Sequence, residues 1–146
     1  MILRKIESGD IQECAKLYAE VFSGPPWNES WTEALALDRL MHFHDSKGFV
    51  GLLAEQENIV GFALGNTEPF QSHKMFYLRE MCTAPEKQFL GIGKQVFGAL
   101  ENELSLLNVT AIFLTTNREI PAARFYISNG FSDNTSMGFY AKKVGS

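Results

Sequence analysis

The chain has 146 residues, 45% of them hydrophobic, so it can bury a core without metal or disulfide staples. Its net charge of −4 and its scattered Lys and Arg residues leave no basic stripe for nucleic acid, and no apolar run approaches membrane-spanning length. Its two cysteines are expected to be free thiols in a reducing compartment, which predicts a cytoplasmic protein.

The first predicted elements are a strand from Ile2 to Ile6 and two helices. The first helix is predicted to start at Asp10, with Glu13 completing a capping box, and its core stripe is Ile11, Cys14, Leu17, Tyr18 and Val21. After a loop at 23–28, a second capping box in Ser30-Trp31-Thr32-Glu33 opens a helix to about Ser46. Its buried stripe is expected to be Ala34, Leu37, Leu40 and Met41.

Three strands are predicted in the middle of the chain. Phe49 to Gln56 and Ile59 to Asn66 form a hairpin around Glu57-Asn58, and Met75 to Thr83 is a central strand. One face of the second strand carries only small residues, which lets another element approach its backbone closely. These residues are Gly61, Ala63 and Gly65.

The last predicted elements alternate between helix and strand. Helices are expected over Lys94–Leu107 and Pro121–Asn129, with a strand from Thr110 to Thr116 between them. A strand from Met137 to Val144 is predicted to close the sheet. No repeat or linker interrupts this order, which predicts a single domain over residues 1–146.

The stretch from Gln88 to Lys94 is the most informative part of the sequence. It is a Gly-rich turn that follows a strand and opens a helix, and such a turn presents unpaired main-chain N–H groups and the positive end of the helix dipole to a phosphate. Gly91 and Gly93 keep side chains away from those groups, and Lys94 adds a charge. Two other interpretations stay open: a dinucleotide-binding loop, which would need G-x-G-x-x-G and a later acidic residue, and a helix start that needs glycine for packing.

The spacing Q-x-x-G-x-G resembles the acyl-CoA pyrophosphate loop of the GNAT superfamily of N-acetyltransferases. The strand exit Thr83-Ala84-Pro85 and the later pattern Asn117…Ala122-x-x-x-Tyr126-x-x-x-Gly130-Phe131 resemble other landmarks of the family, and the resemblance covers most of the chain from Phe49 onward. It implies an α/β fold with a mixed, mostly antiparallel central sheet flanked by about four helices. Several strand sequences also look like the branch that contains aminoglycoside N-acetyltransferases.

The resemblance implies transfer of acetyl from acetyl-CoA to a primary amine of a small molecule, by direct attack in a ternary complex. The alternatives are a protein or peptide acceptor, and an acyl-CoA-binding module without catalysis. In the family, main-chain amides at the positions of Cys82 and Thr83 would polarise the thioester carbonyl. The positions that the resemblance implies for coenzyme binding are Met81, Cys82, Thr83, Gln88, Phe89, Leu90, Gly91, Ile92, Gly93, Lys94 and Asn117.

Two residues are predicted to be catalytic. Glu80 is expected to share a strand face with Phe76, Leu78 and Cys82, so desolvation should raise its pKa toward the range of a general base; the alternative is a buried ion pair, with a partner other than Arg79. Tyr126 matches the family tyrosine that protonates the departing thiolate; the alternative is a core tyrosine.

Two coenzyme positions carry their own alternatives. Cys82 is interpreted as a packing residue rather than a nucleophile, because the sequence places no His predictably near it. Asn117 lies five residues before Ala122, whereas the family interval is three, so a turn or capping role is equally compatible with the sequence.

The resemblance also implies an acceptor site walled by Trp27, Glu29, Trp31 and Phe70, where carboxylates would attract a cationic amine. Taken singly, each of these residues is more typical of a surface or core role than of a ligand contact, and only the cluster indicates an acceptor site. His42 and His44 fall on different faces of a helix, so no metal site is expected. The expected partner is a small-molecule amine, and neither nucleic acid nor a membrane is expected as a partner. The sequence is also compatible with a homodimer.

Overall fold

The computed structural model describes residues 1–145; Ser146, the end of the predicted domain, lies outside the described part. In chain order the elements are β1 (Ile2–Lys5), a 3-10 turn (Ser8–Asp10), α1 (Ile11–Ser23), α2 (Glu33–His44), β2 (Phe49–Glu55), β3 (Ile59–Phe70), β4 (His73–Thr83), a 3-10 turn (Pro85–Lys87), α3 (Ile92–Leu106), β5 (Val109–Phe113) and α4 (Pro121–Ser128). They fall into two compact units, Met1–Leu114 and the part of the chain from Thr115 on, so the single domain stays a prediction.

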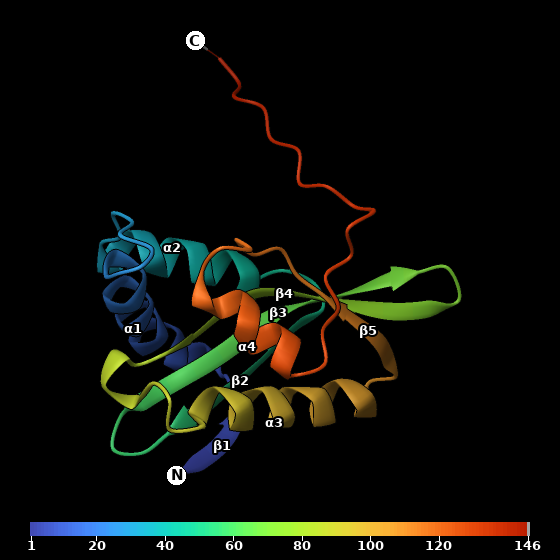
Figure 1. Ribbon diagram of the computed structural model, residues 1–146. Coiled ribbons are helices and arrows are strands. Elements are labelled where there is room, and N and C mark those ends of the chain that lie inside the picture. Colours follow the sequence, from blue (N-terminus) through green and yellow to red (C-terminus); the bar gives the residue numbers. More distant parts are fainter. Residues whose placement is uncertain (146) are drawn as a thin grey trace. The chain divides into compact units, whose positions relative to one another are not determined.

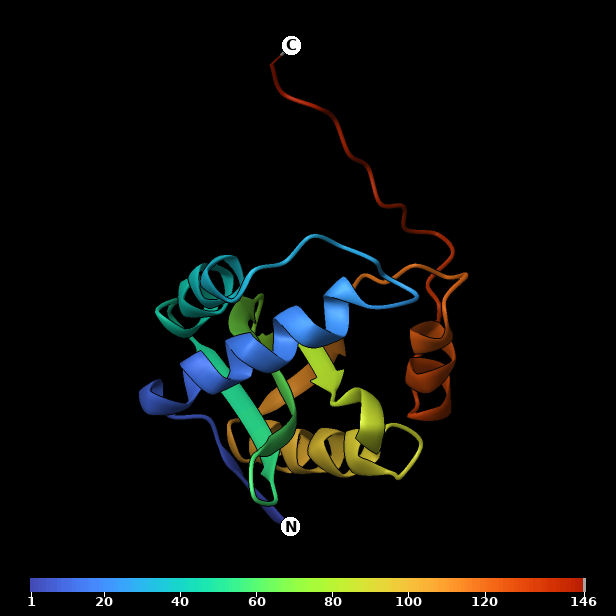
Figure 2. The same cartoon turned by 90° about the vertical axis from the view of Figure 1, so that its left-hand side faces the viewer.

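The first unit is built on one mixed sheet with the strand order β1-β2-β3-β4-β5. All neighbouring strands pair antiparallel except β4 and β5, which are parallel. Helices α1 and α2 cover one face of this sheet and α3 covers the other (Figures 1 and 2). The mixed, mostly antiparallel sheet and the four α-helices among residues 1–145 confirm the predicted fold class.

The core lies on both faces of the sheet. On one face Phe62, Leu64 and Cys82 pack against the predicted stripe of α1 and against Leu40 of α2. On the other face α3 buries Ile92, Val96, Phe97, Leu100 and Leu104. Gly61 lets α3 approach, because a Cβ atom at that position would lie 3.2 Å from Cγ2 of Ile92.

Two predicted helix stripes need correction. In α2 the buried residues are Ala36, Leu40 and Phe43, whereas Ala34 is exposed, because residues spaced by four and three lie on one helix face. At the end of α3, Leu107 lies beyond the last helical residue and is exposed.

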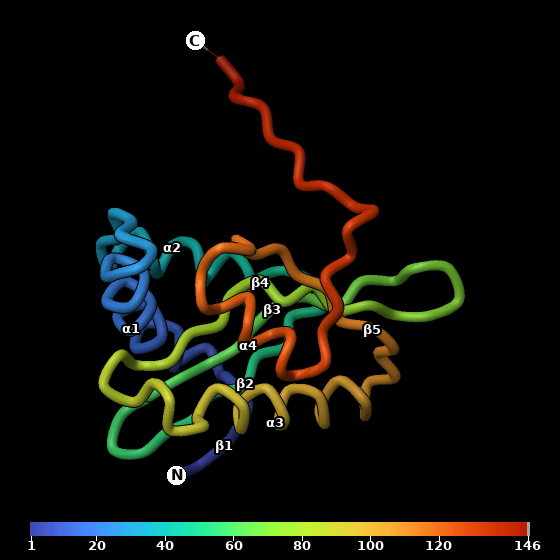
Figure 3. The backbone as a smooth tube through the Cα atoms, viewed as in Figure 1, coloured from blue at the N-terminus to red at the C-terminus, as the bar shows by residue number. Residues whose placement is uncertain are grey.

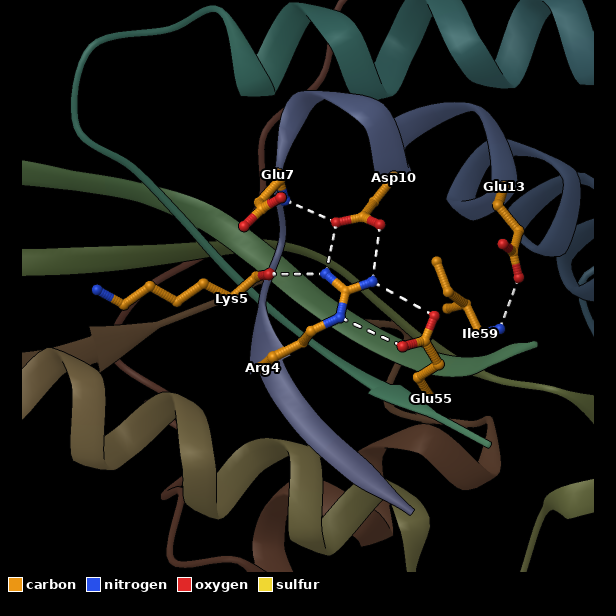
Figure 4. Close-up of polar contacts among 7 residues, drawn as sticks. All are labelled: Arg4, Lys5, Glu7, Asp10, Glu13, Glu55 and Ile59. Atoms are coloured by element: carbon orange, nitrogen blue, oxygen red, sulfur yellow. Dashed lines mark hydrogen bonds and ion pairs between the residues drawn. The ribbon is translucent and has the colours of Figure 1, made fainter. Parts of the chain in front are cut away.

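The N-terminus is held by an ion-pair network rather than by the predicted capping box (Figure 4). The guanidinium of Arg4 donates to both carboxylate oxygens of Asp10, at 2.8 and 2.9 Å, and to those of Glu55, at 3.4 Å each. Asp10 also accepts the N–H of Glu7 at 2.8 Å. Glu13 accepts the N–H of Ile59 at 2.6 Å, so it is not available to cap α1.

The second predicted capping box also shifts. Helix α2 begins at Glu33, and Oγ1 of Thr32 accepts the N–H of Leu35 at 3.1 Å, so Thr32 rather than Ser30 is the cap.

The second unit contains α4 as its helix and no strand among residues 115–145. The predicted closing strand Met137–Val144 is therefore wrong: this segment has neither helical nor strand structure, and its large apolar side chains are exposed. A strand needs a partner for its main-chain hydrogen bonds, and the alternation of apolar residues does not by itself supply one. No helix in the described part of the chain is long and apolar enough to cross a membrane.

Candidate active site

A β-bulge in β4 turns Glu80 toward α1 and α2. Leu64 pairs with Glu80 while the next residue, Gly65, pairs with Leu78, so Arg79 is an extra residue in β4. Adjacent residues of β3 point to opposite faces, and their partners in β4 do the same. Glu80 therefore does not share a face with Leu78 and Phe76, as the sequence predicted, although it does share one with Cys82, which pairs with Phe62.

Glycine at position 65 makes the bulge sterically feasible. A Cβ atom there would overlap the carbonyl oxygen of Tyr77 and would lie 2.8 Å from the ring of Phe76. A side chain at this position would push the two strands apart, so the orientation of Glu80 depends on Gly65.

Three elements meet at the Glu80 carboxylate. Its Oε1 accepts a hydrogen bond of 2.6 Å from Nε of Arg39, which lies on α2. The hydroxyl of Tyr18, on α1, also acts on this carboxylate and lowers its pKa. Glu80 is only 9% exposed, and the predicted alternative of a buried ion pair thus has a definite partner, Arg39.

Opposing effects act on the proton affinity of Glu80. Desolvation by burial raises its pKa and is the largest effect, and the nearby charge of Glu29 raises it further. The charge and hydrogen bond of Arg39 and the hydrogen bond of Tyr18 lower the pKa, but the net direction is upward. A buried carboxylate with a raised pKa holds a proton more readily than an exposed one, which is what the predicted role of a general base requires.

Aromatic side chains surround the same cluster. The ring of Tyr18 lies 5.0 Å from Trp31 and 4.5 Å from Phe22, and Phe22 lies 4.9 Å from Trp27, measured between ring centroids. Nε1 of Trp31 donates to Oε1 of Glu29 at 2.9 Å. The structure therefore brings the predicted acceptor residues Trp27, Glu29 and Trp31 together on the side of the sheet that Glu80 faces.

Phe70, the fourth predicted acceptor residue, lies apart from them. It ends β3 at the tip of the β3–β4 hairpin, where it pairs with His73 and its ring lies 5.8 Å from the His73 ring. Six residues separate it from Leu64 along β3, which corresponds to about 20 Å of strand. This tip and α1 lie at opposite ends of the first unit (Figure 3).

The turn before α3 presents main-chain amides without partners. Gly91 is the N-cap of α3 with φ +82°, and no side chain caps the helix. Residues 88–91 form a turn, and the amides in the first turn of α3, from Gly91 to Lys94, have no intrahelical acceptor. A Cβ atom at Gly91 would meet nothing within 4 Å, and Phe89 is 99% exposed, so the space before these amides is open.

This arrangement fits a phosphate group. The four amides from Gly91 to Lys94 lie at a helix N-terminus, where the helix dipole favours negative charge. Gln88 secures the turn to the end of β4, because its Nε2 donates to the carbonyl oxygen of Thr83 at 3.3 Å. Gln88, Phe89, Leu90 and Ile92 contribute the backbone of this turn, and its binding of a phosphate stays a prediction.

Within the first unit, one edge of β4 is also unpaired. The ladder between β4 and β5 ends at the pair Tyr77–Phe113, so residues 78–83 of β4 have a strand neighbour only on the β3 side. The N–H of Ala84 donates to Val60 of β3 at 2.8 Å. Because main-chain groups alternate along a strand, those of Cys82 also face β3, whereas those of Met81 and Thr83 face the open edge.

Cys82 has the properties of a packing residue. It is buried in the core, and desolvation raises the pKa of its thiol well above the ordinary value, with no cation nearby to oppose the shift. The pKa of the other cysteine, Cys14, is raised to about 12, also mainly by desolvation. Neither thiol is poised to form a thiolate, which favours the interpretation of both as core residues.

The two remaining predicted residues lie in the second unit. Tyr126 is half-buried on α4, with its ring 5.5 Å from those of Phe125 and Phe131. Oδ1 of Asn117 accepts the N–H of Glu119 at 2.8 Å, which is the geometry of a side-chain-closed turn. The unusual interval between Asn117 and Ala122 therefore coincides with a turn that uses the Asn117 side chain.

Sequence reasoning missed two residues of the Glu80 cluster. The sequence predicts Tyr18 only as a core residue of α1 and predicts no role for Arg39 of α2. Arg39 lies four residues before Phe43, a spacing that places the two side chains next to each other on one face of a helix. In the structure the guanidinium carbon of Arg39 lies 5.0 Å from the centroid of the Phe43 ring. A long-range contact such as Arg39–Glu80 has no comparable signal in the sequence.

Comparison with known proteins identifies a family. The model of the acetyltransferase (GNAT) family matches residues 11–131 of this chain. A search of curated proteins finds no match to the sequence.

Several solved structures with the same fold are described as acetyltransferases, and their sequence identity to this chain is low. A putative acetyltransferase from Agrobacterium tumefaciens superposes with a TM-score of 0.78 at 22% identity, over 98% of this chain and 100% of that one. The protein AAC(6')-Iy, solved with the bisubstrate analogue CoA-S-monomethyl-acetylneamine, gives 0.75 at 15% identity over 98% of both chains. An aminoglycoside acetyltransferase from an uncultured soil metagenomic sample, solved with sisomicin, gives 0.76 at 17% identity over 98% of this chain and 96% of that one.

Proposed function

The chain belongs to the acetyltransferase (GNAT) family, and on this premise we propose that it transfers the acetyl group of acetyl-CoA to a primary amine of a small molecule. The observation that carries the proposal is the row of partnerless amides at the start of α3, behind a turn that holds Gly91 in the left-handed conformation. A diphosphate would give these amides acceptors and would benefit from the helix dipole.

Residues of the first unit are proposed to supply further sites for the coenzyme. When bound, acetyl-CoA provides its acetyl group activated as a thioester. The open edge of β4 offers the main-chain N–H groups of Met81 and Thr83 to the pantetheine arm and to the thioester carbonyl oxygen. We assign the carbonyl contact to Thr83 rather than to Cys82, whose main-chain groups face β3.

Glu80 is proposed to accept the proton that the acceptor amine loses, directly or through a water molecule. Its burial and raised pKa support this role, and Arg39 keeps a negative charge tolerable at a buried position. Tyr126 is proposed to donate a proton to the departing thiolate of CoA, because a neutral phenol holds its proton at pH 7 and gives it up to a sulfur anion. Asn117 is proposed to bind the pantetheine arm through its side-chain nitrogen.

The acceptor is proposed to be a small cationic amine that binds near Trp27, Glu29 and Trp31. Indole faces and a carboxylate together attract an ammonium group. The aminoglycoside ligand in one structural neighbour and the acetylneamine analogue in another support small amines as a class. The two buried free cysteines support a reducing compartment such as the cytoplasm, and a homodimer stays a prediction.

A panel of amines and peptides, assayed by release of the free thiol of CoA, tests the proposal. We expect turnover with at least one small amine and weaker turnover with peptides. Turnover with peptides alone would favour a protein acceptor instead. Binding of CoA without turnover across the whole panel would favour the non-catalytic acyl-CoA-binding module.

Replacement of the proposed base separates catalysis from binding. Glu80→Gln should lower turnover by about 100-fold or more and should remove the acid limb of the kcat/KM pH profile, while CoA binding persists. The matched control is Glu101→Gln, the same change at an exposed position of α3, which should leave the profile unchanged. An acid limb that survives in Glu80→Gln would exclude Glu80 as the base.

A further inference from the structure

Arg39 is placed differently from the other arginines with ion pairs in the first unit. Its side chain is 43% exposed, yet its Nε donates at 2.6 Å to a carboxylate that is almost entirely buried. Arg4 instead joins Asp10 and Glu55 at the end of β1, and Arg79 lies 3.7 Å from the half-exposed Glu68. Of these ion pairs, only the one between Arg39 and Glu80 reaches the proposed active site.

The guanidinium of Arg39 is held from two sides. Its central carbon lies 5.0 Å from the centroid of Phe43, one helical turn further along α2. Glu80 holds the other side through the short hydrogen bond. A planar group fixed in this way has little freedom to leave the carboxylate, so it determines how the carboxylate is oriented.

The charged and titratable groups that face Glu80 come from every element packed around it. Tyr18 comes from α1, Arg39 from α2, Glu29 from the loop between these helices, and Cys82 from the same face of β4. Arg39 is the one cation among those that act on Glu80 in the described part of the chain. Without it, burial and the charge of Glu29 would act against ionisation, opposed only by the hydrogen bond from Tyr18.

We propose that Arg39 is a positioning residue for the reaction, which holds the Glu80 carboxylate in place and stabilises its charged form. The inference rests on the proposed role of Glu80 as the base. Arg39 acts through Glu80, and its cation is an internal counter-charge rather than a ligand for the acceptor. Tyr18 assists through its hydrogen bond, with a smaller effect because it carries no charge.

The pH dependence of turnover distinguishes this role from a purely structural one. Arg39→Met keeps much of the side-chain length and removes the cation, so the acid limb of the kcat/KM profile should move upward by about one to three pH units. The lost turnover should return at higher pH. Arg39→Lys restores a charge without the planar fork and should give a smaller shift, and Lys16→Met, at an exposed position of α1, should give none.

A direct titration makes the test independent of turnover and of any one variant. The carboxyl carbon of Glu80, labelled with ¹³C and followed by NMR, should titrate at higher pH in Arg39→Met than in the wild type. If Arg39→Met does not fold, Arg39→Gln and Tyr18→Phe take its place, and both should show upward shifts of the same titration.

The outcomes separate this inference from the proposed function. If Glu80→Gln removes the acid limb but Glu80 titrates at the same pH with and without the Arg39 cation, the role of Arg39 is overturned and Glu80 remains the base. If the acid limb persists in Glu80→Gln, the base assignment fails, and the role of Arg39 fails with it.

Discussion

Two titratable residues of β4, Glu80 and Cys82, face the same side of the sheet and are both buried. Desolvation raises the pKa of both. Around Glu80, a guanidinium and a hydroxyl stabilise the charged form, whereas the ionisable groups near Cys82 are the acidic side chains of Cys14 and Glu80, which disfavour a thiolate. The same burial therefore leaves a carboxylate with stabilising partners at one position, where we propose the base, and a thiol without them two residues later.

At this scale Tyr126 gives a further prediction. Tyr126→Phe removes the phenolic proton and keeps the ring, so turnover should fall by about 100-fold while the Kd for CoA changes little, because proton donation contributes only in the chemical step. Steady-state kinetics and a CoA titration measure the two effects. Tyr140→Phe, the same change at an exposed position in the second unit, is the control, and equal rates in both variants would remove Tyr126 as the acid.

At the scale of elements, the proposed binding of CoA depends on the junction between the Gly-rich turn and α3. Gly91→Ala forces a left-handed residue to carry a side chain, which costs about 1–2 kcal/mol of stability, and it places a methyl group in the open space before the amides. We expect the Kd for CoA to rise at least about tenfold, since contacts to a charged ligand are lost.

The control for this prediction lies in the same helix. Gly98 has an unstrained backbone, and a Cβ atom there meets nothing within 4 Å. Gly98→Ala should stabilise α3 by about 0.5–1 kcal/mol and leave CoA affinity unchanged. Isothermal titration and urea unfolding of the two variants give the comparison; CoA affinity in Gly91→Ala equal to that in Gly98→Ala would refute the role of the turn.

Elements that depend on local patterns were predictable from the sequence. The predicted bounds of α3 and α4 agree with the observed ones to within two residues. Glycine marks the start of α3, proline marks the start of α4, and the apolar spacing that follows is also a local signal. The bulge at Arg79 was not predictable, since it arises from the fit of Gly65 against Tyr77 in the neighbouring strand. The closing strand at Met137–Val144 was predicted wrongly because strand formation requires a partner that the pattern does not name.

At the scale of the whole molecule, the ion-pair network of Arg4, Asp10 and Glu55 joins β1, the start of α1 and β2. The hydrogen bond from Arg4 lowers the pKa of Asp10 below its ordinary value of 3.8. The stabilising effect of the Arg4–Asp10 pair is therefore complete at pH values above 3.8, where Asp10 is ionised in the unfolded chain as well. The effect is lost as the pH falls through the lower pKa that Asp10 has in the folded state.

Urea unfolding at several pH values tests this contribution. Asp10→Asn should lower the free energy of unfolding by about 1–3 kcal/mol at pH 7, and the difference from the wild type should shrink as the pH falls below 3.8. Asp38→Asn, at an exposed position of α2, serves as the control. A difference that stays constant with pH would contradict the assignment of the effect to the Asp10 carboxylate.

The central claim is that the partnerless amides at the start of α3 bind the diphosphate of CoA, and NMR of the ¹⁵N-labelled protein tests it most directly. The amide signals of Gly91, Ile92, Gly93 and Lys94 should shift together during a titration with CoA and should not shift with pantetheine, which lacks the diphosphate. Saturable CoA binding that leaves these four signals in place, or that moves them no more than pantetheine does, would contradict the claim.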